Sequence, residues 1–291
     1  MSDRRTILIQ LDPDPQPSSF DRVVAIDAGV DEVFSYGSVR AEQVEPLVHG
    51  AIFTRGPEDL KRTAIFVGGM DVAAGEELLQ RVLKSFIGPM RVSVMLDANG
   101  ANTTAAAAVH AARRHLELSS ATALVLGGTG PVGQRSALLL AHQGADVRLA
   151  SRSQRRADAA ATAVCEAVGS DRVSGYETYD DDTIGAALEG ADLVISAGAA
   201  GVRLLPRDCW EDAKALKVAI DLNAVPPLGI EGIEVVDKAT ERSGISCYGA
   251  IGVGGTKMKI HKAAIRSLFE SNDKVLDAET IFDLGMGEGG A

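Results

Sequence analysis

The sequence is poor in aromatic residues and has no long apolar run. Phe, Trp and Tyr make up 4% of its 291 residues, with a single Trp. No stretch reaches the roughly 18 apolar residues that a membrane-spanning helix needs. The first apolar run ends at Leu11 and is followed by acidic residues and prolines, so it is too short for a signal peptide. We therefore expect a cytoplasmic protein without a membrane segment.

Basic residues are also scarce relative to acidic ones. The chain has 29 Lys and Arg against 40 Asp and Glu, a net charge of −11, and a pI near 5.0. An acidic surface repels nucleic-acid phosphates and anionic lipids, so we expect neither as a partner. Hydrophobic residues make up 46% of the chain, enough for full cores, and the length suggests about two domains.

Cysteine and metal-binding patterns are almost absent. The three cysteines, Cys165, Cys209 and Cys247, are far apart and form no CxxC motif, which is typical of reduced thiols. The sequence contains no H-E-x-x-H motif and no obvious carboxylate triad at ligand spacing. We therefore predict that no metal is required.

Strand and helix patterns alternate along the chain, which predicts an α/β fold with parallel sheets and right-handed crossovers. In the first third we expect strands at 6–11, 22–26, 63–67 and 91–96, a helix at 40–48, and a second helix that Asp71 caps and that includes the apolar residues from Leu78 to Leu83. An alanine-rich helix at 102–115 then bridges two domains. Beyond it we expect strands at 123–126, 146–150, 193–196 and 218–221, and helices at 131–142, 156–168, 257–269 and 275–285.

A glycine-rich loop follows the strand expected at 123–126. Six residues fit the dinucleotide-binding pattern G-x-G-x-x-G, namely Gly128, Thr129, Gly130, Pro131, Val132 and Gly133. We expect Gly128 to permit the tight turn, Gly130 to let a pyrophosphate approach the backbone, and Gly133 to let helix and strand pack closely. The helix N-terminus then attracts the phosphates.

The end of the next strand indicates which dinucleotide binds. NAD sites usually carry Asp or Glu there, whereas this sequence has Ser151 and Arg152, followed by Arg155 and Arg156. A hydroxyl and guanidinium groups suit a 2′-phosphate, so NADP is predicted over NAD. Alternatively, Arg155 and Arg156 only begin a solvated helix.

Small residues follow later strands. Ser196, Ala197 and Gly198, and separately Gly254, would let the ribose or nicotinamide lie close to the backbone. Each glycine could equally serve a structural turn. Asn223, after the strand expected at 218–221, is a candidate contact for the nicotinamide.

Four segments together resemble methylene-tetrahydromethanopterin dehydrogenases, most closely the bacterial NADP-dependent type. They are DANGANTTAAA (97–107), GGTGPVGQRSA (127–137), DLNAVPPLGIEGI (221–233) and GAIGVGGTKMKIHKA (249–263), and Phe20-Asp21 also fits. The resemblance covers essentially the whole chain. It implies a pterin-binding lobe (1–112 with 268–291), an NADP-binding Rossmann domain (113–267), a cleft between them, and a homo-oligomer, commonly a trimer.

The resemblance also implies site residues. Asp97, Asn99, Asn102, Thr103 and Thr104 would line the pterin side, with Phe20 and Asp21 as further substrate contacts. Lys257 would reach the cleft from the other lobe, although Lys259 is an alternative. Arg152 and Arg156 would face the 2′-phosphate.

The implied reaction removes a hydride from a methylene group held between two nitrogens, leaving a delocalised cation. No proton moves at the reacting carbon, so placement and electrostatics suffice. We therefore expect the scattered histidines to be structural. Asp97 is the candidate carboxylate beside the cation, or else a helix cap, and Thr103 and Thr104 either bind the pterin or cap the helix. Lys257 is expected just after a glycine turn, at the start of a helix, where it would orient the pterin.

Other functions stay open at this point. A methylene-tetrahydrofolate dehydrogenase with cyclohydrolase activity would need a Tyr–Lys pair on one N-terminal helix, and none is evident. Another small-molecule NADPH reductase and an NADPH-sensing regulator without turnover are further alternatives. The sequence does not distinguish tetrahydromethanopterin from tetrahydrofolate as the carrier.

Overall fold

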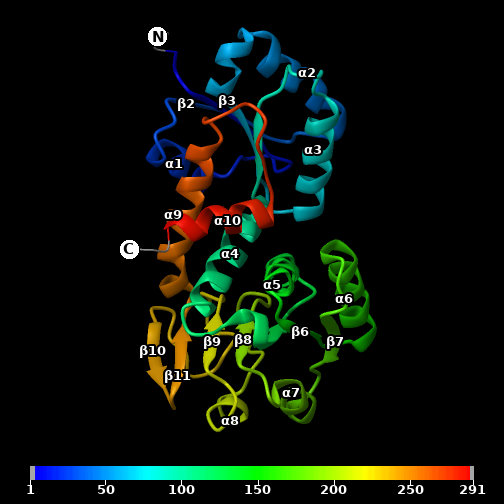
Figure 1. Ribbon diagram of the computed structural model, residues 1–291, viewed down its shortest axis with the longest axis vertical. Coiled ribbons are helices and arrows are strands. Elements are labelled where there is room, and N and C mark those ends of the chain that lie inside the picture. Colours follow the sequence, from blue (N-terminus) through cyan, green and yellow to red (C-terminus); the bar gives the residue numbers. More distant parts are fainter. Residues whose placement is uncertain (1–3, 289–291) are drawn as a thin grey trace. The chain divides into compact units, whose positions relative to one another are not determined.

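The computed structural model describes residues 4–288, which divide into two compact units (Figure 1). Unit 1 runs to Thr103 and resumes at Met258, and unit 2 is Thr104–Lys257. Both divisions fall inside helices, α4 (Ala101–Ala112) and α9 (Ala250–Ser267). The boundaries expected from the sequence lie at the ends of these helices instead, because a sequence pattern shows where a helix stops and not where its contacts change. Residues 1–3 and 289–291 of the expected pterin lobe lie outside the described residues.

Unit 1 contains a sheet of five parallel strands in the order β12-β4-β3-β1-β2. The strands are β1 (Ile7–Leu11), β2 (Glu32–Tyr36), β3 (Thr63–Val67), β4 (Ser93–Leu96) and β12 (Val275–Leu276). The helices are α1 (Ser19–Asp27), α2 (Ala41–Phe53), α3 (Val72–Lys84) and α10 (Ala278–Glu288), with short 3₁₀ turns η1 (Pro57–Arg62) and η2 (Ala98–Gly100). Every residue of β3 and β4 is buried, as expected for inner strands covered on both faces.

The strand predicted at 22–26 is wrong, because these residues lie in α1. Ser18 caps this helix by accepting a hydrogen bond from the Asp21 N–H at 3.3 Å. Val24 and Ala25 are buried, whereas Val23 and Ile26 are exposed. The β-branched run therefore supplies one apolar side of a helix, and the capping serine outweighs the β-propensity of the run.

Unit 2 contains a seven-stranded sheet in the order β10-β11-β9-β8-β5-β6-β7 (Figure 1). The strands are β5 (Thr122–Leu126), β6 (Asp146–Ser151), β7 (Val173–Glu177), β8 (Leu193–Ser196), β9 (Val218–Asp221), β10 (Lys238–Arg242) and β11 (Ile245–Tyr248). The helices are α5 (Pro131–His142), α6 (Gln154–Val168), α7 (Asp181–Leu188) and α8 (Arg207–Trp210), with a 3₁₀ turn η3 (Leu118–Ser120). Only β10 among these strands is antiparallel. The remaining order, β7-β6-β5-β8-β9-β11, is that of a dinucleotide-binding Rossmann fold, which confirms the predicted fold class.

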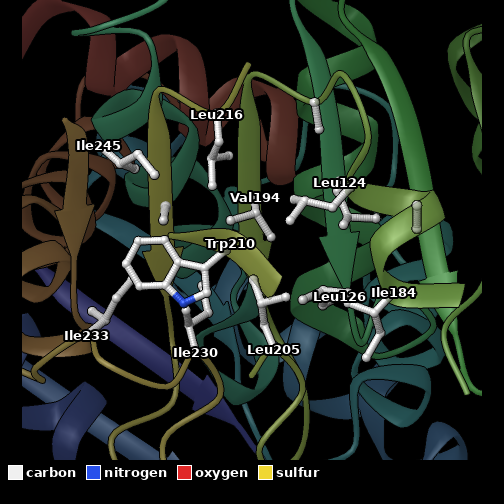
Figure 2. Packing of buried hydrophobic residues seen from close by; sticks show 14 of the residues in the cluster. Leu124, Leu126, Ile184, Val194, Leu205, Trp210, Leu216, Ile230, Ile233 and Ile245 are labelled. Carbon is white, nitrogen blue, oxygen red and sulfur yellow. The ribbon is translucent and has the colours of Figure 1, made fainter. Parts of the chain in front are cut away.

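One face of this sheet packs against α7 and α8. Figure 2 shows Trp210 of α8 among Leu205, Ile230 and Ile233, with Val194 of β8 beside them. The Trp210 indole is fully buried, and its Nε1–H donates to the Glu231 carbonyl at 3.0 Å. The cluster includes Leu124 and Leu126 of β5 and Val194 of β8, so it covers one face of both strands.

The glycine turn expected before Lys257 is also wrong. Helix α9 begins at Ala250, so Gly252, Gly254 and Gly255 are all helical. A Cβ on Gly252 would lie 1.8 Å from the Asp237 carbonyl oxygen, so this glycine lets the helix pack against a neighbouring loop. Within residues 4–288, no helix combines the length and apolarity needed to cross a bilayer.

Candidate functional site

The glycine-rich loop joins β5 to α5 where the strand order of unit 2 reverses, between β5 and β8. Ligands of open α/β sheets bind at such a point, beyond the carboxyl ends of the strands. Gly127, rather than the predicted Gly128, takes the left-handed conformation (φ +66°) of the tight turn. A Cβ on Gly128 would lie 2.7 Å from Leu149 Cγ, and one on Gly133 would lie 2.7 Å from the Gly127 oxygen. Both positions therefore need glycine for packing.

Gly130 differs from its neighbours because a Cβ there would meet nothing closer than 3.4 Å. Gly130 is also the N-cap of α5, with Pro131 at the first helical position and no side chain capping the helix. The amides of the first turn, including those of Val132 and Gly133, are thus left for another acceptor. An open glycine before an uncapped helix N-terminus fits a pyrophosphate. The backbone carbonyl of Thr129 supports the loop by accepting a hydrogen bond of 2.9 Å from Gln134 Nε2.

The end of β6 carries an uncompensated positive charge. Ser151 is 8% exposed, and Arg152, Arg155 and Arg156 are all exposed at or before the first turn of α6. Within residues 4–288, none of the three guanidinium groups forms a hydrogen bond or ion pair. Cations are unfavourable at a helix N-terminus, so this arrangement favours an anionic ligand. The nearby carboxylate of Glu177 accepts the Gln154 N–H at 3.4 Å.

On the other side of the switch point, small residues serve loop packing. A Cβ on Gly127 would lie 2.6 Å from Gly198 Cα, and one on Gly198 would lie 2.4 Å from Leu204 Cδ1. Ser196 is fully buried, and Ala197 adjoins the Gly127 turn. The structure brings these residues to the glycine-rich loop. Gly254 instead lies in α9, where a Cβ would meet no atom within 4 Å.

Asn223 and Asp221 organise the loop after β9. Asn223 Oδ1 accepts the Val225 N–H at 3.0 Å, and its Nδ2 donates to the Pro227 carbonyl at 3.3 Å. The Asp221 carboxylate, 1% exposed, accepts the Asn223 and Ile230 N–H groups at 3.1 and 2.9 Å. Burial raises the pKa of Asp221 despite these hydrogen bonds. Both side chains therefore act within the loop that faces the carboxyl edge of the sheet.

In unit 1, Asp97 follows β4 and caps α4. Its Oδ1 accepts the Asn102 and Thr103 N–H groups, both at 3.0 Å, and its Oδ2 accepts the Thr103 hydroxyl at 2.6 Å. Asn102 Nδ2 also donates to the Leu96 carbonyl at 2.6 Å. Asp97, Asn102 and Thr103 are at most 3% exposed. Asn99 is exposed in a left-handed conformation (φ 53°), which asparagine tolerates better than most residues.

In unit 2, Thr104 and Lys257 contact each other. Lys257 Nζ donates to Thr104 Oγ1 at 2.9 Å, and both side chains are half-buried. Lys257 lies inside α9 and not at the start of a helix, where the sequence analysis expected it. Two residues that the sequence analysis proposed separately as site candidates are thus in direct contact.

Phe20 and Asp21 begin α1, near the switch point of the unit 1 sheet between β1 and β3. Phe20 is 51% exposed. A Cβ on Gly68, which follows β3, would lie 3.5 Å from Asp12 Oδ2 and 3.6 Å from Asp21 Oδ2. Two carboxylates thus flank a glycine where α/β sheets bind ligands. Burial raises the pKa of Asp12, which accepts the Asp14 and Ser18 N–H groups.

Two residues near Phe20 and Asp21, namely His261 and Asp12, were not predicted as site residues from the sequence. His261 is fully buried and stacks on Phe66, with ring centroids 5.9 Å apart, while its centroid is 6.3 Å from that of Phe20. Asp12 directly follows β1. The sequence did contain a signal for each residue. His261 lies four positions after Lys257 on the same helix, a spacing that places two side chains on one helix face. Asp12 comes directly after a strand, a position that the sequence analysis used for other site residues. Among the described residues, no group of three His, Cys, Asp or Glu side chains could hold a metal ion.

Comparisons with known proteins identify relatives of this sequence and of this fold. A family model described as methylene-tetrahydromethanopterin dehydrogenase, N-terminal, matches residues 19–99. The solved structures of shikimate 5-dehydrogenase from Listeria monocytogenes (14% identity, TM-score 0.53, covering 98% of this chain and 99% of that one) and quinate dehydrogenase from Corynebacterium glutamicum (16%, 0.50, 98% and 100%) share the fold.

Two relatives from Methylorubrum extorquens align along nearly their whole length. Bifunctional protein MdtA is 46% identical over 96% of this chain and 98% of its own. NAD(P)-dependent methylenetetrahydromethanopterin dehydrogenase is 33% identical over 97% of this chain and 98% of its own. Such identity over such coverage means that the chain belongs to the methylene-tetrahydromethanopterin dehydrogenase family.

Proposed function

We propose that this protein is an NADP-dependent dehydrogenase that oxidises methylene-tetrahydromethanopterin to its methenyl cation by direct, reversible hydride transfer, in one-carbon metabolism. The observation that carries the proposal is the open Gly130 cradle before the uncapped N-terminus of α5, at the switch point of unit 2. Membership of the family supports the substrate, and the name of one relative supports a nicotinamide cofactor.

Bound NADP supplies the two-electron acceptor. The substrate carbon lies between two nitrogens whose lone pairs stabilise the cation left behind, so the chain has to position its ligands and exclude water rather than move a proton. The described side chains suit that task. Gly130 and the first turn of α5 would hold the pyrophosphate, and Arg152 and Arg156 would hold the 2′-phosphate.

Unit 1 would bind the pterin and unit 2 the dinucleotide. We assign Phe20, Asp21 and Asn99 to direct pterin contacts, because these side chains are exposed or half-buried at the carboxyl edge of the unit 1 sheet. Asp97 does not touch the pterin; its carboxylate accepts the backbone N–H groups of Asn102 and Thr103 and so positions these two residues. Lys257 orients a carbonyl of the pterin, and Thr104 holds the ammonium group of Lys257.

NADP is proposed over NAD on charge. Ser151 stands where an NAD site usually has a carboxylate, and three exposed guanidinium groups follow it. Each charge-assisted hydrogen bond to a phosphate contributes about 1.5–3 kcal/mol. We also propose that the protein is cytoplasmic, needs no metal, and forms a homo-oligomer, a trimer by analogy with its family, which sedimentation analysis would test.

The proposal is tested by mixing the purified protein with NADP and methylene-tetrahydromethanopterin and following the NADPH absorbance band. Parallel reactions contain methylene-tetrahydrofolate or no pterin, and NAD replaces NADP in a further set. We expect pterin-dependent NADPH formation. Tight NADPH binding without turnover on either carrier would show a regulatory protein instead, and turnover on tetrahydrofolate alone would reassign the carrier.

A further inference from the structure

We propose that Tyr179 forms an aromatic wall for the adenine ring of the dinucleotide. This inference rests on the proposed cofactor site and adds a residue that the glycine-rich loop and the arginines do not include. Tyr179 is 75% exposed, the largest exposed fraction among the large apolar side chains of the described residues. A tyrosine ring this accessible to water gains little from its own fold, so a ligand that covers it would gain the burial energy.

The position of Tyr179 follows from the strand order. A Rossmann sheet binds its adenosine half over the first three strands, which here are β5, β6 and β7. Ser151 at the end of β6 pairs in register with Glu177 at the end of β7, and the Thr178 N–H donates to the Ser151 carbonyl at 2.9 Å. Tyr179 therefore emerges from the same sheet edge as Arg152, one strand further out. The ribose phosphate at Arg152 would leave the adenine beside that strand.

The backbone that carries this ring is well anchored. The Tyr179 N–H donates to Thr183 Oγ1 at 3.0 Å, and the Asp180 carboxylate accepts the Thr183 N–H at 2.9 Å as the N-cap of α7. These hydrogen bonds from Thr183 also lower the pKa of Asp180, which keeps the cap ionised. Ile184 and Leu188 then bury one side of α7 in the core of unit 2. A rigid turn holding a solvent-exposed ring is a preorganised stacking surface.

The chemistry selects an aromatic base rather than a charged or aliphatic ligand. Stacking of a nucleobase on an aromatic side chain is worth roughly 1–3 kcal/mol and depends on the flat face, not on a hydrogen-bonding edge. Removing the ring should thus weaken every adenine-containing ligand by the same factor. It should not discriminate between NAD and NADP, unlike a change at Arg152.

The test measures dissociation constants by titration calorimetry for 2′,5′-ADP, NADP, NAD and nicotinamide mononucleotide. For Tyr179→Ala we expect affinity for the three adenine ligands to fall by roughly 5- to 150-fold, with the mononucleotide unchanged. Tyr179→Phe should bind like the parent. Val236→Ala, an exposed apolar position just before β10 at the opposite edge of the sheet from β7, serves as the control and should change none of them. The melting temperature of Tyr179→Ala should match that of the parent.

Each outcome has one meaning. Unchanged affinity of Tyr179→Ala for 2′,5′-ADP, with the parent binding it, overturns the adenine wall alone. Loss of NADP but not NAD binding also overturns it, because it would show a defect at the 2′-phosphate. If the parent binds none of the adenine ligands, the proposed cofactor site falls as well. An ultraviolet difference spectrum of bound 2′,5′-ADP that disappears in Tyr179→Ala would support stacking directly.

Discussion

Lys257 Nζ, in the interior of α9, donates a hydrogen bond of 2.9 Å to Thr104 Oγ1 in α4. The threonine hydroxyl thus fixes the position of one ammonium hydrogen. A Lys head group has three donors on a flexible stem, so a fixed partner reduces the conformational entropy lost when a ligand binds.

Lys257→Met should therefore lower turnover by at least about tenfold, equivalent to ~1.4 kcal/mol of barrier, with NADP affinity kept. Thr104→Val should give a smaller loss in the same direction, since it keeps the ammonium group and removes only its hydrogen bond to the threonine hydroxyl. Lys259→Met is the matched control, because Lys259 lies exposed on the same helix. Steady-state kinetics and calorimetry check this, and a Lys257→Met enzyme with parental turnover contradicts it.

Gly127→Ala should lower the stability of the fold, whereas Gly130→Ala should weaken NADP binding. Alanine at 127 must adopt φ +66°, which costs roughly 1–2 kcal/mol, and its Cβ would press on Gly198 Cα at 2.6 Å. We expect a lower melting temperature. Alanine at 130 meets nothing closer than 3.4 Å, so the fold should persist while NADP binding weakens because the methyl group enters the phosphate space. Normal NADP affinity in folded Gly130→Ala would show that the phosphate lies elsewhere.

These two glycines also show how far sequence reasoning reaches. The G-x-G-x-x-G pattern located the loop and its helix, yet it placed the tight turn at Gly128, because the pattern does not say which glycine has a positive φ. The strand predicted at 22–26 failed because an apolar run as short as Val23 to Ile26 does not reveal whether its burial has a period of two or 3.6 residues. The glycine turn predicted before Lys257 is wrong because a glycine-rich segment can either end a helix or allow close packing inside one, and the sequence alone does not distinguish the two.

The candidate site was predicted in part for the same physical reasons. Residues that follow strands, such as Asp97 and Ser151, were recognisable because the carboxyl ends of parallel strands share an edge. The hydrogen bonds that commit Asp97 to Asn102 and Thr103 depend on side-chain directions that a sequence does not contain. His261 and Asp12 belong to clusters assembled from distant segments, and only the fold brings those together.

Arg152→Ala should weaken NADP by roughly 10- to 150-fold while leaving NAD nearly unchanged, because one charge-assisted phosphate contact contributes about 1.5–3 kcal/mol. The exposed guanidinium forms no bond within the described part of the chain, so its removal should not alter stability. Direct titration with both cofactors provides the measurement. Equal losses for NAD and NADP would place Arg152 outside the 2′-phosphate site.

Asp97→Asn and Asp97→Ala separate a cap from an electrostatic role. The asparagine keeps a carbonyl oxygen for the Asn102 and Thr103 amides, so we expect most of the turnover to remain. The alanine loses the cap, at about 0.5–2 kcal/mol, and leaves the buried Thr103 hydroxyl with only its longer hydrogen bond, of 3.3 Å, to the Gly100 carbonyl. Thermal melting and turnover are measured together. A stable Asp97→Asn enzyme that has lost most of its turnover would instead assign the negative charge itself to the reaction.

His115 should make stability depend on pH in one direction. Its Nε2 lies 2.8 Å from Tyr248 Oη, and burial, followed by the charge of Arg114, lowers the pKa of His115 below its ordinary value. The unfolded chain therefore takes up this proton first as the pH falls. Stability should decline from the ordinary histidine pKa down to the lowered one. Melting temperatures across that window check this, and His115→Gln should remove this contribution. An unchanged slope in the variant would assign the effect to other groups.

An isotope label shows whether the hydride passes directly from the pterin carbon to the nicotinamide. The enzyme is given NADP and methylene-tetrahydromethanopterin carrying deuterium on the methylene carbon, in ordinary water, and the NADPH is analysed by mass spectrometry. A second reaction uses unlabelled substrate in heavy water. We expect deuterium in the NADPH of the first reaction and none at the nicotinamide carbon in the second. Deuterium lost to solvent in the first reaction, or gained from solvent in the second, would rule out direct hydride transfer.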